Sequence, residues 1–261
     1  MNVRYAEIDE AIAYIQRNLD EPLPLTRLAR HVAFSTFHFA RIFKERMGLP
    51  PLYYVSSLRL QRAKELLLES NLSVRQIGLE IGQQSLGTFT TRFTERVGMT
   101  PGEFRQSEPL AERSIQLLRE LSDWREQMAA TADSGSRVTG VVASDEPFDG
   151  FVLIGLFNKP IPEGLPTYGT LLPSLGSFSF SGVKPGIYYL MATSVSWEMQ
   201  ARDFLLPHRT LRSRYHAPLF VGPHAEVPPM QLKLYPPRPD DPPILVALPA
   251  LMNRFLSRIG K

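Results

Sequence analysis

Residues 43–51 recur fifty positions later in the chain, and this repeat constrains the fold more than any other feature. The first copy reads Phe-Lys-Glu-Arg-Met-Gly-Leu-Pro-Pro, and the second, at residues 93–101, reads Phe-Thr-Glu-Arg-Val-Gly-Met-Thr-Pro. Similarity at a fixed interval indicates a duplicated supersecondary unit. Each copy is typical of the end of an amphipathic helix, where Gly suits a left-handed cap and a following Pro prevents continuation. The repeat therefore predicts two helix-turn-helix units.

The composition sets limits on the class of protein. A chain of 261 residues is long enough for two compact domains. No apolar run reaches the roughly 18 residues that cross a bilayer, and the first residues lack the apolar core of a signal peptide. The absence of Cys excludes disulfides, thiolate metal sites and Cys nucleophiles. We expect a cytoplasmic protein with no membrane partner and no cofactor.

Charge and proline are distributed unevenly along the chain. Residues 1–106 carry 14 Lys or Arg against 11 Asp or Glu, whereas residues 107–261 carry 15 of each. This excess permits nucleic-acid binding but falls short of the strongly basic surface that usually signals it. Only 5 of the 23 prolines lie in residues 1–106. Because helix interiors exclude Pro, the architecture should change from helices to strands after about residue 106.

The N-terminal part shows helical periodicity in successive segments. Apolar stripes predict helices at about residues 8–19, 25–32, 36–47, 51–70, 74–81 and 85–97. Ser35 and Ser73 are expected N-caps. The helix-turn-helix units then lie at about residues 25–47 and 73–97. The second helix of such a unit lies in a DNA major groove with its N-terminal residues at the base edges, so this pattern favours duplex DNA as the partner.

Four stretches of the N-terminal part carry a family resemblance. They are Asn18-Leu-Asp-Glu-Pro-Leu-Pro-Leu, Phe34-Ser-Thr-Phe-His-Phe-Ala-Arg-Ile-Phe-Lys-Glu-Arg-Met-Gly, Arg59-Leu-Gln-Arg-Ala-Lys-Glu-Leu-Leu and Phe93-Thr-Glu-Arg-Val-Gly-Met-Thr-Pro-Gly-Glu-Phe-Arg. Through them, residues 5–106 resemble the DNA-binding domain of the arabinose-operon regulator (AraC/XylS) family. The resemblance implies a seven-helix monomeric module that places two reading helices in successive major-groove faces of double-stranded DNA.

The resemblance also implies which residues contact DNA. They are Thr36, Phe37, His38, Ala40, Arg41 and Lys44 on the first reading helix, and Ser85, Leu86, Gly87, Thr88, Thr91 and Arg92 on the second. The periodicity of the second helix, however, turns Leu86 inward and Arg96 outward. The chain departs from the family at Gln83, where an aromatic is usual, and at Thr91, where Arg is common. The first helix should therefore discriminate sequence more strongly.

A seven-residue apolar pattern follows the repeated part of the chain. Its members are Leu110, Leu117, Leu121, Trp124 and Met128. They predict a connecting helix within the linker at residues 107–136, whose last six residues are typical of a flexible joint. This helix either docks on its own domain or pairs two chains into a homodimer.

Residues 137–261 show a different periodicity. Short alternating runs bounded by Gly, Pro and Asp predict an all-β sandwich. The runs lie at residues 138–142, 151–157, 176–182, 186–193, 219–221 and 230–235. Asp241 and Pro242 predict the start of a closing helix with an apolar face of Ile244, Leu248, Leu251, Phe255 and Ile259. The run at 176–192 resembles the transthyretin-like, carboxypeptidase-regulatory β-sandwich, which implies a binding or stabilising module.

Few residues of this second part indicate further chemistry. His208, His216 and His224 recur every eight residues without other ligands at a suitable spacing, and the Arg202–Arg214 cluster is typical of a solvated loop or, less often, an anion site. No catalytic motif is present. The sequence thus predicts a non-enzymatic, multidomain α and β transcription regulator, an activator that engages RNA polymerase. Its sandwich would bind a small-molecule effector or another chain. The alternatives are a small-molecule enzyme and a constitutive architectural DNA binder.

Overall fold

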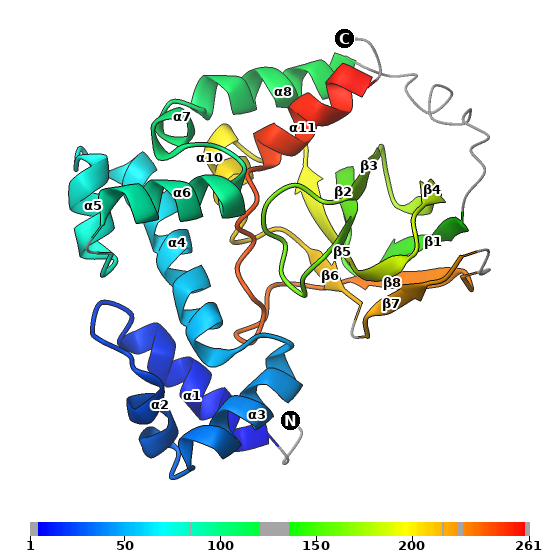
Figure 1. Cartoon of the computed structure of the whole chain (residues 1–261). Coiled ribbons are helices and arrows are strands. Elements are labelled where there is room, and N and C mark those ends of the chain that lie inside the picture. Colours follow the sequence, from blue (N-terminus) through cyan, green and yellow to red (C-terminus); the bar gives the residue numbers. More distant parts are fainter. Residues whose placement is uncertain (1–4, 84, 121–135, 216, 224–226, 259–261) are drawn as a thin grey trace. The chain divides into compact units, whose positions relative to one another are not determined.

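The chain forms two compact units. The computed structural model describes residues 5–83, 85–120, 136–215, 217–223 and 227–258 (Figure 1). Met1–Arg105 and Arg238–Leu245 form a helical unit, and Gln106–Pro237 and Val246–Lys261 form a β-rich unit. The return of Arg238–Leu245 to the helical unit differs from the simple division at residues 106 and 137 that we expected. Within the described ranges, no helix is long and apolar enough to cross a membrane.

The helical unit follows the predicted order of helices. Its elements are α1 (Ala6–Arg17), α2 (Leu25–His31), α3 (Thr36–Met47), α4 (Pro51–Glu69), α5 (Val74–Glu80), α6 (Leu86–Val97) and α7 (Pro101–Arg105). Gly48 and Gly98 end α3 and α6 with φ of 76° and 86°, a left-handed conformation that Gly adopts at little cost. Pro50 and Pro51 then direct the chain into α4, because Pro fits the first helical turn. The predicted bounds agree with these to within two residues.

Each helix-turn-helix unit has its own apolar core. Phe39 and Phe43 of α3 are fully buried in a cluster that α1, α2 and the start of α4 complete. In the second unit, the ring of Phe93 lies 5.7 Å from that of Phe89 and 5.8 Å from that of Phe104, measured between centroids. The long helix α4 runs from the first helix-turn-helix unit to the second (Figure 1). It therefore determines how far apart α3 and α6 lie.

The described residues of the β-rich unit form two sheets. Its strands are β1 (Ser136–Ser144), β2 (Gly150–Phe157), β3 (Tyr168–Leu172), β4 (Gly176–Val183), β5 (Gly186–Ser196), β6 (Arg212–Arg214), β7 (Leu219–Val221) and β8 (Met230–Leu234). One sheet has the order β4-β1-β8, and the other has the order β3-β2-β5-β6 with β7 also paired to β5. Strand β1 is antiparallel to β4 and parallel to β8. The sequence did not predict β3 and β6.

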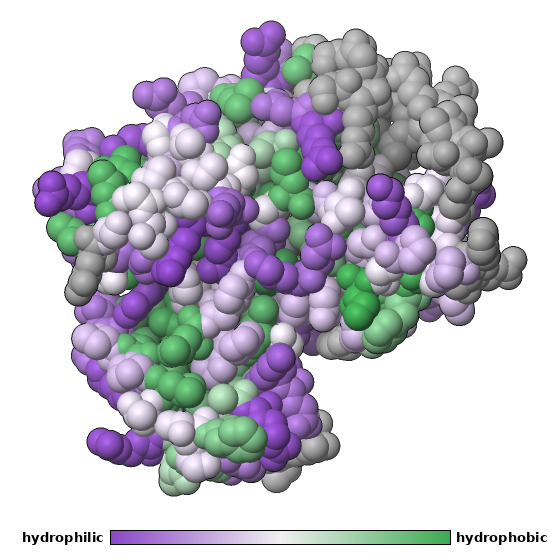
Figure 2. Space-filling view, viewed as in Figure 1, coloured by the Kyte–Doolittle hydropathy of each residue, from purple (hydrophilic) through white to green (hydrophobic). Residues whose placement is uncertain are grey.

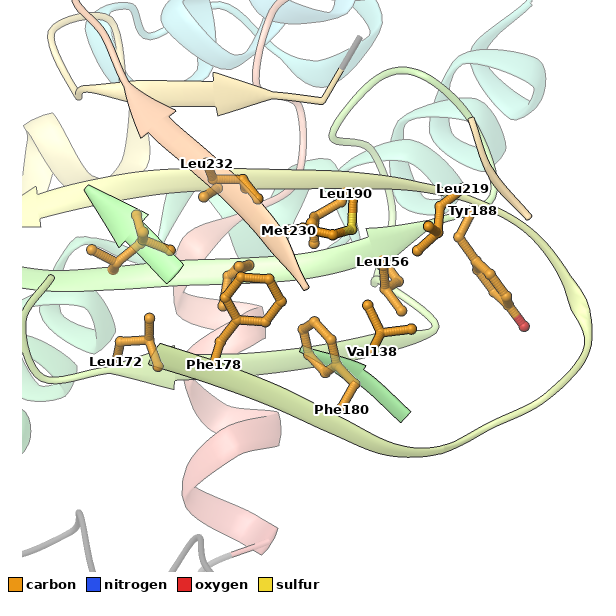
Figure 3. Packing of buried hydrophobic residues seen from close by; sticks show 14 of the residues in the cluster. Val138, Leu156, Leu172, Phe178, Phe180, Tyr188, Leu190, Leu219, Met230 and Leu232 are labelled. Atoms are coloured by element: carbon orange, nitrogen blue, oxygen red, sulfur yellow. The ribbon is translucent and has the colours of Figure 1, made fainter. Parts of the chain in front are cut away.

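One apolar cluster is shared by both sheets. Phe178 and Phe180 of β4 lie on one side of it with Val138 of β1, and Leu156 of β2 and Leu190 of β5 lie on the other (Figure 3). All five side chains are buried. The alternating burial of β1, β4 and β8 places one face of that sheet in the cluster and the other in solvent.

Helices also belong to this unit, where a connecting helix and a closing helix were predicted and one further short helix, α10 (Ala201–Leu205), was not. The helices among the described residues are α8 (Glu108–Glu120), α10 and α11 (Leu248–Arg258), and α8 packs against the other two. The buried face of α8 carries Ala111, Ile115 and Leu118, whereas Leu110 and Leu117 of the predicted seam are only half-buried. Leu121, Trp124, Met128 and most of the expected flexible joint lie outside the described residues.

The closing helix begins at Leu248 and not near Asp241. A residue that precedes Pro is disfavoured in the helical conformation. Asp241 precedes Pro242, which precedes Pro243, and no helix forms at residues 241–245. Pro249 suits the first turn of the helix, which starts at Leu248. The predicted Ile259 lies outside the described residues.

Candidate nucleic-acid interface

The first candidate surface lies at the start of α3. Ala33 has a φ of 56°, an uncommon value for a residue other than Gly, and makes the tight turn between α2 and α3. Ser35 then accepts a hydrogen bond at Oγ from the backbone N of His38 at 3.3 Å. This confirms Ser35 as the N-cap and satisfies one of the amides that a helix start leaves unpaired. The turn and the cap together fix the direction in which α3 begins.

Most predicted contact residues of α3 face solvent. Those exposed are Thr36, Phe37, His38, Arg41 and Lys44, whereas Ala40 is half-buried. Phe37 is 80% exposed, which is unusual for a large apolar side chain. The guanidinium of Arg41 lies 3.5 Å from Nδ1 of His38 and 3.7 Å from Glu45 Oε2. These long contacts are weak and hold Arg41 only loosely.

The second candidate surface lies at the start of α6. Ser85 caps this helix by accepting a hydrogen bond from the backbone N of Thr88 at 3.3 Å. The exposed residues that follow are Leu86, Gly87, Thr88, Thr91 and Arg92. A side chain at Gly87 would meet nothing within 4 Å, so the helix surface is open there. Arg92 donates from Nη1 to Oε1 of Gln83 at 3.3 Å. The expectation that Leu86 is buried was wrong, since it is 45% exposed.

Arg96, which the periodicity placed on the exposed side of α6, is instead buried. It donates from Nη2 to Ser57 Oγ at 2.5 Å and from Nη1 to Ser56 Oγ at 3.2 Å, and its guanidinium lies 4.3 Å from the ring centroid of Tyr53. Arg96 therefore anchors the end of α6 to α4. Helical periodicity assigns Arg to the surface by default, so only the duplication of this Arg in both repeats signals a structural role.

The burial of one lysine was also not predicted from the sequence. Lys64 of α4 is fully buried, donates from Nζ to the backbone O of Ile244 at 3.1 Å, and lies 5.5 Å from the ring centroid of Phe104. Burial lowers the pKa of Lys64 to about 7, and the neighbouring carboxylate of Glu65 opposes this shift only partly. Lysine is normally exposed, so no sequence pattern indicates such a site.

The hydropathy of the surface is mixed over the helical unit. Figure 2 shows hydrophobic patches among hydrophilic ones over the region of α1 to α3. Two of the exposed apolar residues, Phe37 and Leu86, stand in the first turns of α3 and α6. Apolar side chains in such positions can contact the methyl group of thymine in a major groove.

The structure gives little support to the metal and anion sites considered in the sequence analysis. In the described part of the chain, no group of three His, Cys, Asp or Glu could hold a metal ion. His208 is exposed, and His216 and His224 lie outside the described residues. Within the Arg202–Arg214 cluster, Arg212 donates from Nη2 to the backbone O of Pro207 at 2.7 Å. This Arg therefore supports its own loop.

Comparison with known proteins identifies the helical unit. A helix-turn-helix domain family matches residues 28–107. The transcriptional activator AarP of Providencia stuartii is 31% identical over 101 residues, which are 39% of this chain and 75% of AarP. A solved transcriptional regulator of Chromobacterium violaceum, described as having an AraC-type DNA-binding domain, is 34% identical and matches 39% of this chain and 90% of its own, with a TM-score of 0.38. The chain belongs to the AraC family.

The matched region is only part of some of the relatives. The transcriptional regulator ArgR of Pseudomonas aeruginosa is 34% identical over 101 residues, which are 39% of this chain and 31% of ArgR. The chain thus spans about a third of the length of ArgR. The matched relatives are helix-turn-helix transcription regulators, and the likeness to them agrees with the two helix-turn-helix units of the helical unit.

Proposed function

We propose that this AraC-family chain binds a specific sequence of double-stranded DNA and activates transcription, with α3 and α6 in successive major-groove faces. The observation that carries the proposal is the pair of Ser-capped helices whose first turns are exposed, held apart by the single helix α4. Helix-turn-helix proteins read base edges with the first turns of the second helix. The activating role is supported by the likeness to AarP, a transcriptional activator.

The two reading helices would contribute differently. On α3, Arg41 makes only weak contacts within the chain, so its guanidinium can donate two hydrogen bonds to a guanine, and His38 lies beside it. On α6, the exposed positions offer Gly87 and Thr88, and the guanidinium of Arg92 is already engaged by Gln83. We infer that α3 supplies most of the base discrimination and that α6 contributes mainly contacts to phosphates.

The role of Arg41 can be tested on a duplex selected by the intact protein from a random pool. Arg41→Ala should cost roughly 1–3 kcal/mol of binding free energy on the selected duplex and relax the preference at one base pair. Binding to a random duplex should weaken far less, because that binding depends on phosphate charge. Titration of both duplexes at one fixed salt concentration measures the difference.

Arg92→Ala is the matched control, because it removes the same charge from the second reading helix. It should weaken binding to the selected and the random duplex by the same factor, as expected for a phosphate contact. If Arg41→Ala also weakened both duplexes equally, Arg41 would touch phosphate only and the assignment of α3 as the discriminating helix would be wrong.

We further propose that the β-rich unit is a transthyretin-like sandwich that binds a small-molecule effector or a second copy of the chain. Support comes from the apolar core shared by its two sheets and from the run at 176–192, which forms β4 and the start of β5. Recruitment of RNA polymerase would then complete the activation. A ligand that binds only the native unit raises its melting temperature, so a thermal-shift screen can find it.

A further inference from the structure

Residues 238–245, here called the strap, pack against the helical unit, and residues 242–245 are buried. The strap contacts three helices: Pro239 O accepts a hydrogen bond from Gln16 of α1 at 3.1 Å, Asp240 pairs with Arg46 of α3 at 2.8 Å, and Ile244 O accepts from Lys64 of α4 at 3.1 Å. These partners lie 180 to 223 residues away in the sequence. The strap is therefore part of the fold of the helical unit.

The strap is also stiff. Three of its residues are Pro, which fixes φ and restricts the residue before it. A turn at its start is closed by Asp241, whose Oδ2 accepts from the backbone N of Arg238 at 2.8 Å, while its own N donates to Arg238 O at 3.0 Å. This turn presents the neighbouring carboxylate of Asp240 to Arg46. A movement of either end of the strap would thus be transmitted along it rather than absorbed.

The duplicated Arg has different partners in the two repeats. Arg96 of the second repeat is anchored to Ser56 and Ser57 of α4. Its counterpart Arg46 reaches Asp240 of the strap at 2.8 Å and Asp9 of α1 only at 3.5 Å. The first reading helix is therefore anchored to a segment that the chain supplies from between β8 and α11.

The position of Arg46 leaves an alternative pairing open. Among the described residues, Arg46 Nε and Asp9 Oδ1 are both buried and neither has a hydrogen-bond partner. If the strap moved away, the guanidinium could turn to Asp9 and satisfy both atoms. The Arg46–Asp240 pair is about one-third exposed on each side, so it is weak enough to open and close. Arg46 can thus anchor α3 in two ways.

We propose that the strap couples the β-rich unit to the first reading helix, with Asp240 as the positioning residue that acts on α3 through Arg46. The inference rests on the proposed DNA binding. Only three residues separate β8 from the strap and two separate the strap from α11. Because such short connections span only a short distance, a shift of β8 or α11 should displace the strap as well. The strap-bound arrangement is the DNA-competent one, because Phe37, His38 and Arg41 are exposed in it.

The test uses the intact chain and its selected duplex, with two variants of that duplex. In the first-half variant, the base pairs whose preference depends on Arg41 are altered. In the second-half variant, the base pairs that α6 faces are altered. Asp240→Asn should weaken binding to the unaltered duplex and to the second-half variant by about five-fold, the effect of a partly exposed ion pair. It should have no effect on the first-half variant. Asp240→Glu, which keeps the charge, should restore binding.

Asp145→Asn is the charge-matched control, since it removes one exposed acid from the β-rich unit, and it should bind as the parent chain does. Hydrogen exchange at α3 should be faster in Asp240→Asn while exchange at α6 is unchanged. Equal losses on all three duplexes, or no change in binding or exchange, would overturn the coupling while DNA binding stands. Failure of the unaltered chain to select any duplex would instead refute the proposed function.

Discussion

Replacement of Lys64 with Met should remove a steep pH dependence from the stability of the helical unit. Burial lowers the pKa of Lys64 to about 7, whereas an unfolded Lys titrates near 10.4. Between these values the unfolded state binds more protons, so the free energy of unfolding rises with pH by at most ~1.4 kcal/mol per pH unit. The contribution is therefore lost as pH falls from about 10 to about 7, and it is constant below that.

Urea unfolding followed by far-ultraviolet circular dichroism from pH 7 to 9.5 measures this slope. The parent chain should gain roughly 2–3 kcal/mol over this range relative to Lys64→Met. Lys44→Met is the matched control, because Lys44 is exposed on α3 and its loss should leave the slope unchanged. Parallel curves for the parent and Lys64→Met would show that Lys64 stays charged through contact with Ile244 O or with water.

Replacement of Arg96 with Ala should destabilise the helical unit by about 2–4 kcal/mol, because it removes two hydrogen bonds from a charged group and the packing on Tyr53. The buried hydroxyl of Ser57 would lose its donor as well. Arg92→Ala, on the exposed side of the same helix, should change stability by less than about 0.5 kcal/mol. Denaturant midpoints of the two variants make the comparison.

A loss from Arg96→Ala no larger than that from Arg92→Ala would show that α6 does not depend on this anchor. A large loss of stability accompanied by unchanged hydrogen exchange at α6 would place the effect in α4. Either result would remove the basis for comparing Arg96 with Arg46.

The helices of the N-terminal part could be predicted because their signals are local. Apolar stripes, the Ser35 and Ser73 caps and the left-handed Gly48 and Gly98 all lie within a few residues of the ends that they define. The resemblance then supplied the candidate contacts, and the structure exposes all of them except Ala40 on their helices or at the cap. Whether these residues touch DNA is not a local property, so it remains a prediction.

The features that sequence reasoning missed depend on contacts between distant residues. Lys64, Arg46 and Arg96 are polar residues whose partners come from other helices or from the strap, and helical periodicity counts such residues as exposed. The strap itself was misread as the start of a helix, because Asp241 followed by Pro242 is also a common helix start. Strand β6, with the sequence Arg-Ser-Arg, has no apolar alternation to predict it.

The central claim is that α3 and α6 enter successive major-groove faces of one DNA site. Footprinting of the intact chain on its selected duplex, with probes of the major groove, tests it most directly. We predict two protected major-groove segments about ten base pairs apart on one face of the duplex, the spacing of one helical turn. A single protected segment would contradict the account, because it would mean that α6 stays outside the groove.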